Sequence, residues 1–286
     1  MSGNIGLDVF ISPYKPVVST VPGWDSSKQA TWPASTASLL SGERDAVLID
    51  ALITVAEAEQ LTGWVRATGK RLTAVYITHG HGDHFFGLNT ILAAFPDAKA
   101  LALPQVVPAA QEQVEGGNMG YWEATFPGQI PRKPIVPEPI DGTRIDLEGH
   151  ELRLIDVGQS DTHPSSVVHV PDLQAVVGGD VAYNGIHMWL ALTGHTEREG
   201  WLAALDTVES LAPKILVAGH QDPAASNTDV AGMLAASRQY IRDFDEAAAA
   251  AGSAEELIAA MMSRHGNRGN PYTLWTAAAA MFAAQP

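Results

Sequence analysis

A cluster of histidine and aspartate side chains directly follows the apolar run Ala74–Ile77. The cluster reads His79-Gly-His81-Gly-Asp83-His84, so that three imidazoles and one carboxylate fall within six positions. Neutral imidazole nitrogens and carboxylate oxygens are the ligands that Zn²⁺ and neighbouring divalent metals take in proteins. Because glycine lets the backbone bend sharply, we expect these side chains to converge on one point and bind a metal ion.

Three further candidate segments lie where apolar runs end. Asp180 follows the run 175–179, and His220 follows the run 215–219. The third segment is the turn from Gly158 to His163, which follows residues 152–157. Strand ends at one edge of a sheet can place residues that are distant in sequence in a common cleft. We therefore expect these segments and the first cluster to form one site.

Composition limits the chemistry and the partners. The 286 residues contain no cysteine, which excludes thiolate ligands, disulfides and a cysteine nucleophile. The net charge of −15 and the lack of a Lys/Arg cluster argue against nucleic acid, and no apolar stretch reads as a membrane span. Because no basic and apolar leader opens the sequence, we expect a cytoplasmic protein. The expected partner is a small-molecule substrate, and homodimer formation remains open.

The order of elements predicts an α/β fold with two β-rich layers and helices outside. A hairpin is expected from the runs 36–40 and 46–50, and a capping box at residues 54–57 predicts a helix to about residue 68. A second capping box at residues 196–199 predicts a helix to about residue 211. Further strands are expected at 72–78, 98–103, 143–147, 151–157, 166–170, 175–179 and 214–218, and further helices at 85–95, 227–250, 253–264 and 271–284.

Residues 116–140 differ from the rest because glycine and proline are frequent there. This composition predicts a long irregular segment, although Tyr121, Trp122 and Phe126 need an apolar surface to cover. Such a segment is either a lid or binding loop that shapes an apolar pocket, or a packed surface loop.

The motif order resembles that of the metallo-β-lactamase superfamily over roughly residues 36–222. The resemblance implies an αββα sandwich, with residues 1–225 as the family domain and residues 226–286 as a C-terminal helical extension packed on it. It also implies a metal centre, usually dinuclear, at one edge of the sandwich. By position, the first metal would be bound by His79 and His81, the second by Asp83, His84 and His220, and Asp180 would bridge the two.

One position departs from the superfamily pattern, which usually has a metal-binding histidine where this chain has Gln159. An amide oxygen is uncharged and a poor ligand for Zn²⁺. Three outcomes follow. The first metal keeps His79, His81 and Asp180 with weaker affinity, or His163 replaces the missing ligand, or the protein works with one metal or none.

The resemblance implies a hydrolase in which metal-bound hydroxide attacks an ester, lactone or thioester carbonyl. Tyr183, three residues after Asp180, resembles the N-acyl homoserine lactone lactonase branch, where a tyrosine hydrogen-bonds the substrate carbonyl. Asp83 would orient the nucleophile and pass a proton to the leaving group. The substrate pocket is expected to include Tyr183, His187, Tyr121 and Trp122.

Two alternatives remain open from the sequence. The same scaffold hosts mononuclear iron oxidoreductases, and the loss of one histidine at Gln159 would also suit a binding protein that is impaired in catalysis. Zn²⁺ is the expected cofactor, with one or two ions per chain, but Mn, Fe and Co accept the same ligands.

Overall fold

The first sheet is built on the hairpin that the sequence predicts, in a computed structural model that describes residues 4–283. Strands β4 (Ser35–Ser41) and β5 (Asp45–Ile49) pair antiparallel, and β6 (Arg71–Ile77) adds in parallel to β5. The strand order is β13-β15-β4-β5-β6-β7-β8, and β1 pairs with β4. These other strands are β1 (Gly6–Ser12), β7 (Lys99–Ala102), β8 (Glu138–Pro139), β13 (Tyr183–Asn184) and β15 (His220–Gln221).

The second sheet has the order β14-β12-β11-β10-β9. Its strands are β9 (Arg144–Leu147), β10 (His150–Gly158), β11 (Ser165–Val170), β12 (Ala175–Val177) and β14 (Ile215–Val217). A small third sheet pairs β2 (Lys15–Pro16) with β3 (Thr31–Trp32). Both predicted β-rich layers are therefore present.

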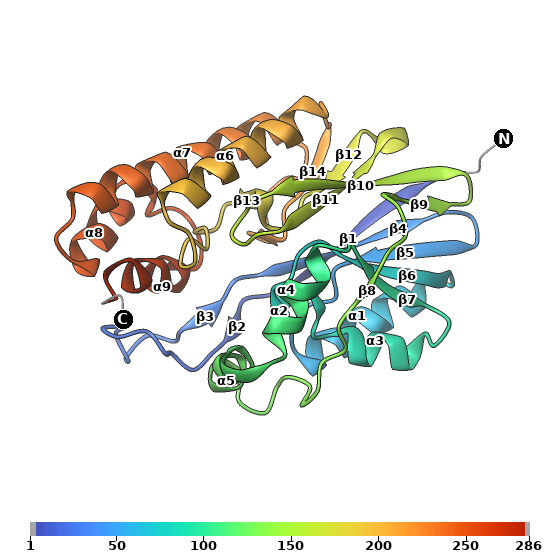
Figure 1. Ribbon diagram of the computed structural model, residues 1–286, viewed down its shortest axis with the longest axis horizontal. Helices are drawn as coiled ribbons and strands as arrows, with labels where there is room; N and C mark the ends of the chain where they lie inside the picture. Colours follow the sequence, from blue (N-terminus) through green and yellow to red (C-terminus); the bar gives the residue numbers. More distant parts are fainter. Residues whose placement is uncertain (1–3, 284–286) are drawn as a thin grey trace.

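Helices cover the outer faces of the two sheets, as Figure 1 shows: α1 and α3 lie below the first sheet in this view, and α6 and α7 lie above the second. This arrangement confirms the expected αββα sandwich. Helix α1 (Val55–Ala67) begins at the predicted capping box, in which the Thr54 hydroxyl accepts from the Glu57 backbone N–H. The other helices are α2 (Gly82–Phe85), α3 (Leu88–Ala94), α4 (Val106–Gln113), α5 (Gly116–Thr125), α6 (His195–Ser210), α7 (Val230–Ala250), α8 (Ala254–His265) and α9 (Pro271–Phe282), with 3₁₀ turns η1 (Pro171–Leu173) and η2 (Gly179–Val181).

Apolar side chains form two cores. The larger core lies between the two sheets and under α1, and includes Leu39, Val75 and Val168. The smaller core joins the second sheet to α6–α9 and includes Trp201 and Phe244. Helices α7–α9 therefore pack on the same layer as α6, and no helix within residues 4–283 is long and apolar enough to cross a membrane.

The prediction of an irregular segment at 116–140 was wrong for its first part, where α5 forms despite its glycines. Trp122 and Phe126 are buried, and both rings pack edge-on against Trp32. This burial of aromatic surface outweighs the weak helix propensity of glycine, which costs only about 1 kcal/mol per residue.

Two predicted helix boundaries also differ from the structure. The helix expected at 85–95 is divided between α2 and α3, because the Gly87 N–H donates to the Leu52 carbonyl at 3.0 Å instead of to a carbonyl within the helix. Helix α6 begins before Thr196, since the Glu197 carboxylate accepts from the backbone N–H of Gly194 and caps the helix at that residue.

Candidate metal centre

The first histidine cluster occupies the tight turn after β6 and the helix α2 that follows it. A Cβ atom at Gly80 would lie 2.8 Å from the backbone of Ala109 and Ala110, so only glycine allows this close contact of the turn with α4. His79 and His81 lie in the turn, Asp83 and His84 lie in α2, and all four are buried. The sequence therefore places four potential ligands within one buried bend.

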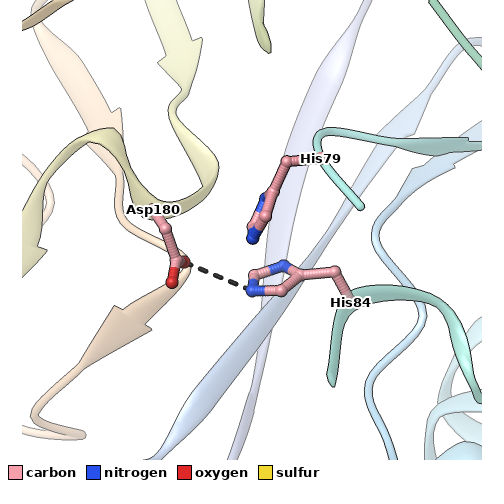
Figure 2. Close-up of side chains that lie close together, drawn as sticks. All are labelled: His79, His84 and Asp180. Atoms are coloured by element: carbon pink, nitrogen blue, oxygen red, sulfur yellow. Dashed lines mark ion pairs between the residues drawn. The ribbon is translucent and has the colours of Figure 1, made fainter. Parts of the chain in front are cut away.

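The distant segments meet this bend at the edge of the sandwich. Nε2 of His84 lies 3.3 Å from Oδ1 of Asp180, and Nε2 of His220 lies 3.3 Å from Oδ2 of the same carboxylate. Nε2 of His220 is also 3.2 Å from Oδ2 of Asp83. Figure 2 shows His79, His84 and Asp180 pointing towards one another, and its dashed line marks the His84–Asp180 pair. The structure thus brings together all six residues to which the family resemblance assigns metal binding.

Among the described residues, four groups of side chains have their ligand atoms within 4.8 Å of one another. Three of them form this site: His79, His84 and Asp180; His79, His81 and Asp161; and Asp83, His84 and His220. The fourth, His195, Glu199 and Asp245, shares no residue with them. Asp161 is the member that the sequence analysis missed as a ligand. The available signal was a carboxylate in the turn that follows β10, two residues after Gln159.

Hydrogen bonds on the far side of three imidazole rings fix how the rings face the cluster. Nδ1 of His84 lies 2.9 Å from Asp50 Oδ2, and Nδ1 of His79 lies 3.0 Å from Thr78 Oγ1. Nδ1 of His220 lies 3.3 Å from the Ala34 carbonyl. A proton held on Nδ1 leaves the lone pair of Nε2 free, as metal-binding histidines require.

Several buried polar atoms in the cluster lack a hydrogen-bond partner among the described residues. They are Nε2 of His79, Nε2 of His84 and Oδ1 of Asp180. Buried polar atoms are nearly always satisfied, because leaving one unpaired costs free energy. Imidazole nitrogen and carboxylate oxygen are also the donors that a divalent cation takes, so these residues fit a bound metal.

The charges within the cluster support the same interpretation. Burial acts to raise the pKa of Asp180, but His220 and His84 outweigh it and hold that pKa well below its usual range. Burial acts to lower the pKa of His220, but the Asp180 and Asp83 carboxylates raise it to about 9. In the metal-free cluster Asp180 is therefore ionised and His220 carries a proton, which a bound cation would displace.

The two proposed substitutes for the missing histidine ligand lie outside the cluster. The side-chain amide of Gln159 donates to the Ser160 carbonyl at 3.0 Å, and its Cβ atom faces Gly200 on α6. His163 is exposed, so its prediction as a replacement ligand was wrong. The turn after β10 directs Asp161 inwards, where it is only 1% exposed, and leaves His163 at the surface.

A cavity of about 360 Å³ opens beside the cluster and reaches His81, Asp83, Asp161, Asp180 and His220. Its walls are Trp32, Pro33, Gln113, Asn118, Tyr121, Trp122, Tyr183, Trp189, Ala191, Leu192, Thr273, Thr276 and Ala280. Three of the predicted pocket residues, Tyr121, Trp122 and Tyr183, therefore line it. The sequence analysis missed Trp32, whose indole Nε1 donates to Asp83 Oδ2 at 3.0 Å.

His187 does not line this cavity, and its prediction as a pocket residue was wrong. It is fully buried, and its Nδ1 lies 2.9 Å from the Tyr240 hydroxyl. Burial, with a smaller effect of the Arg268 charge, lowers the pKa of His187 to about 3. The ring is therefore neutral in the folded protein at neutral pH.

Neutral burial of His187 predicts a loss of stability in acid. The unfolded chain binds this proton below pH about 6.5, whereas the folded chain does so only near pH 3. The stability gained by keeping the ring neutral is thus complete above pH 6.5 and is lost as the pH falls towards 3, with a slope of at most about 1.4 kcal/mol per pH unit. Urea unfolding of the metal-free protein at pH 7, 6, 5 and 4 should show a shallower pH dependence for His187→Gln than for wild type. His163→Gln, at an exposed position, serves as the control, and equal slopes for all three proteins would contradict the assignment.

Comparison with known proteins agrees with this geometry. The model of the metallo-beta-lactamase superfamily matches residues 30–220, which is more than half of the chain. This protein therefore belongs to the metallo-beta-lactamase superfamily. No curated protein matches the chain.

Solved structures share the fold at low sequence identity. A metallo-beta-lactamase from Pontibacter korlensis has a TM-score of 0.60 at 18% identity, covering 84% of this chain and 100% of that one. A metallo-beta-lactamase family protein from Thermus thermophilus has a TM-score of 0.64 at 16% identity, covering 95% and 91%. The metallo-beta-lactamase FIM-1 from Pseudomonas aeruginosa, in its mono-zinc form, has a TM-score of 0.57 at 14% identity, covering 83% and 91%.

Proposed function

We propose that this protein is a metal-dependent hydrolase of neutral esters, lactones or thioesters whose acyl part is apolar. The proposal is carried by one observation, a largely apolar cavity that opens directly on the cluster of imidazoles and carboxylates. The superfamily typically contains metal-dependent hydrolases, which supports the class of reaction. The partner that we propose is accordingly a small molecule.

The donor set divides between two positions for divalent cations. His79 and His81 would hold one ion, and Asp83, His84 and His220 would hold the other, with Asp180 between them. Zn²⁺ suits these nitrogen and oxygen ligands, which also accept Mn, Fe and Co. When bound, such an ion lowers the pKa of a coordinated water towards about 7 and so provides hydroxide at neutral pH.

Tyr183 is the best candidate to stabilise negative charge on the substrate carbonyl oxygen. Its hydroxyl lines the cavity and donates to Asp180 Oδ2 at 2.6 Å. Burial, and then the Asp180 charge, raise the pKa of Tyr183 well above its usual range, so the phenol keeps its proton. By turning this hydrogen bond from Asp180 to the substrate, Tyr183 would act as an oxyanion donor.

Asp83 is the best candidate to orient the attacking water. Burial alone would raise the pKa of its carboxyl, but the charges and hydrogen bonds of His84 and His220 outweigh burial and lower it. The ionised carboxylate also lines the cavity, where it would accept a hydrogen bond from the attacking water and direct its proton towards the leaving group. Because its lowered pKa makes it a weak base, this role is to orient the water rather than to hold the proton.

The cavity wall beyond the metal ligands favours an uncharged acyl chain. The lining residues outside the cluster are aromatic, aliphatic or neutral polar, and none of them is a lysine or arginine. A carboxylate on the acyl chain would therefore be desolvated without an ion-pair partner, which costs several kcal/mol. Apolar acyl groups would instead pack against the rings of Trp32, Trp122 and Trp189.

A matched pair of substrates tests the proposal. We expect the zinc-loaded protein to hydrolyse p-nitrophenyl hexanoate with a kcat/KM at least about 100-fold above that for the mono-p-nitrophenyl ester of adipic acid. The two acyl chains have the same length and differ only in the terminal carboxylate. Asn118→Lys, which adds a cation to the cavity wall, should narrow this ratio because it supplies the missing ion-pair partner.

Asn267→Lys is the control for the added charge, because this exposed residue does not line the cavity. It should leave the ratio of the two kcat/KM values unchanged. Preference for the adipate ester by the wild-type protein would refute the substrate class. Failure to hydrolyse any neutral ester, lactone or thioester would refute the proposed function as a whole.

A further inference from the structure

We propose that Asp161 replaces the missing histidine and binds the first metal ion together with His79 and His81. The family pattern places its ligand at position 159, but Gln159 lies against α6, with its amide bonded to the Ser160 carbonyl. The next carboxylate along the same turn points into the cluster instead. This chain would thus hold its first metal ion with two imidazoles and one carboxylate.

The contacts of Asp161 carry the inference. Its Oδ2 lies 2.7 Å from Nδ1 of His81, and its Oδ1 lies 3.8 Å from Nε2 of His79. Tetrahedral zinc with bonds of about 2.0 Å needs neighbouring ligand atoms about 3.3 Å apart, a separation that these two distances bracket. One ion between the three side chains therefore requires only small movements of atoms that already face one another.

A second observation points to a ligand at this position. Nε2 of His79 is buried and has no hydrogen-bond partner among the described residues. The side chain of His79 is 1% exposed, so water is largely excluded from it. The Thr78 hydroxyl lies 3.0 Å from Nδ1 of the same ring, which fixes Nε2 as the nitrogen that faces Asp161.

Neighbouring groups hold the Asp161 carboxylate in this orientation. The Ser160 hydroxyl donates to its Oδ1 at 2.9 Å, and that hydroxyl also contacts the Ser165 hydroxyl at 2.6 Å. Ser165 pairs with His79 across an isolated β-bridge, so the turn and the histidine loop are tied together. A carboxylate that is held by such outer contacts is preorganised to bind a cation.

The exchange of a neutral histidine for Asp161 changes the charge of the site. A carboxylate adds one negative charge beside the first ion, whereas an imidazole adds none. Oxygen donors also suit Mn²⁺ better than imidazole does. We therefore expect the first position to discriminate less strongly in favour of Zn²⁺ over Mn²⁺ than a position built from three imidazoles.

Metal titration of the full chain tests the role of Asp161. The metal-free protein is titrated with Co²⁺, and bound ions are counted both by elemental analysis and by their visible absorption. We expect Asp161→Asn to weaken the binding of one ion by at least about 100-fold, because a ligand is lost. Gln159→Ala should bind both ions as wild type does.

A rescue variant separates ligand loss from structural damage. Asp161→His should bind the ion that Asp161→Asn loses, because its imidazole takes the position that faces His79 and His81. Circular dichroism in EDTA should show the same secondary structure for wild type and Asp161→Asn, so that loss of the ion is distinguished from loss of the fold. Titration with Mn²⁺ and Zn²⁺ should show a higher Zn²⁺ preference for the rescue variant, in which the introduced imidazole is the ligand, than for wild type.

Two outcomes would overturn this inference. The first is that Asp161→Asn binds every ion that wild type binds, and the second is that Gln159→Ala loses the ion of the first position. The test reads metal binding rather than turnover, so a failure of ester hydrolysis would refute the proposed function and leave the Asp161 assignment intact.

Discussion

Replacement of Asp180 by asparagine is expected to cause the largest loss of activity, with turnover lower by at least about 10³-fold. Both oxygens of Asp180 face histidines of the cluster: Oδ1 lies 3.3 Å from His84 Nε2, and Oδ2 lies 3.3 Å from His220 Nε2. Its Oδ2 also accepts the Tyr183 hydroxyl at 2.6 Å. The amide keeps the shape of the side chain but removes its charge and one of its two acceptor oxygens. Initial rates with p-nitrophenyl hexanoate and metal content per chain measure the effect.

Asp97→Asn provides the matched control for Asp180→Asn. Asp97 is exposed in the turn before β7 and belongs to none of the clusters, so its variant should keep wild-type turnover and metal content. Full turnover by Asp180→Asn with its metal content intact would contradict the central place of this carboxylate.

Gly219→Ala is expected to disrupt the metal centre although it adds only one methyl group. The new Cβ atom would collide with Oδ1 of Asp180 and lie 3.0 Å from His84 Cε1. The backbone cannot easily move away, because Gly219 N donates to the Gly179 carbonyl at 2.6 Å and the Gly219 carbonyl accepts from Thr36 at 2.8 Å. We expect metal binding to weaken by at least about 100-fold and the free energy of unfolding to fall by about 1–3 kcal/mol. Metal titration and urea unfolding measure the two effects.

Gly63→Ala is the control for the same chemical change at an open position. Gly63 is exposed within α1, and a Cβ atom there meets no heavy atom within 4 Å. Alanine at this helical site should raise stability by up to about 1 kcal/mol and leave metal binding unchanged. Equal metal affinity for Gly219→Ala and wild type would show that the metal centre does not require the close contact of Gly219 with Asp180 and His84.

Local sequence signals predicted much of the scaffold and the gathering of the candidate ligands. The hairpin at 36–50 and the helix after Thr54 follow from apolar periodicity and a capping box, which depend on neighbouring residues alone. The convergence of Asp180 and His220 on the histidine turn follows because all three segments end strands.

Long-range contacts decide the features that the sequence did not predict. The turn after β10 contains a carboxylate, but its sequence does not determine that Asp161 faces the histidines while Gln159 faces α6, because both orientations depend on segments far away in the chain. The burial of Trp122 and Phe126 against Trp32 converts a glycine-rich stretch into α5 for the same reason. The exposed position of His163 and the enclosed position of His187 are likewise set by tertiary packing.

The fluorescence of Trp32 is expected to respond to both substrate and metal binding. One face of its indole belongs to the aromatic wall, while its N–H is bonded to the Asp83 carboxylate. Binding of a substrate in the cavity and binding of a cation by Asp83 would each change the electric field at the indole ring. Engineering of the wall for new substrates can therefore begin at Leu192, which is 64% exposed, whereas a change at Trp32 would also alter the environment of Asp83.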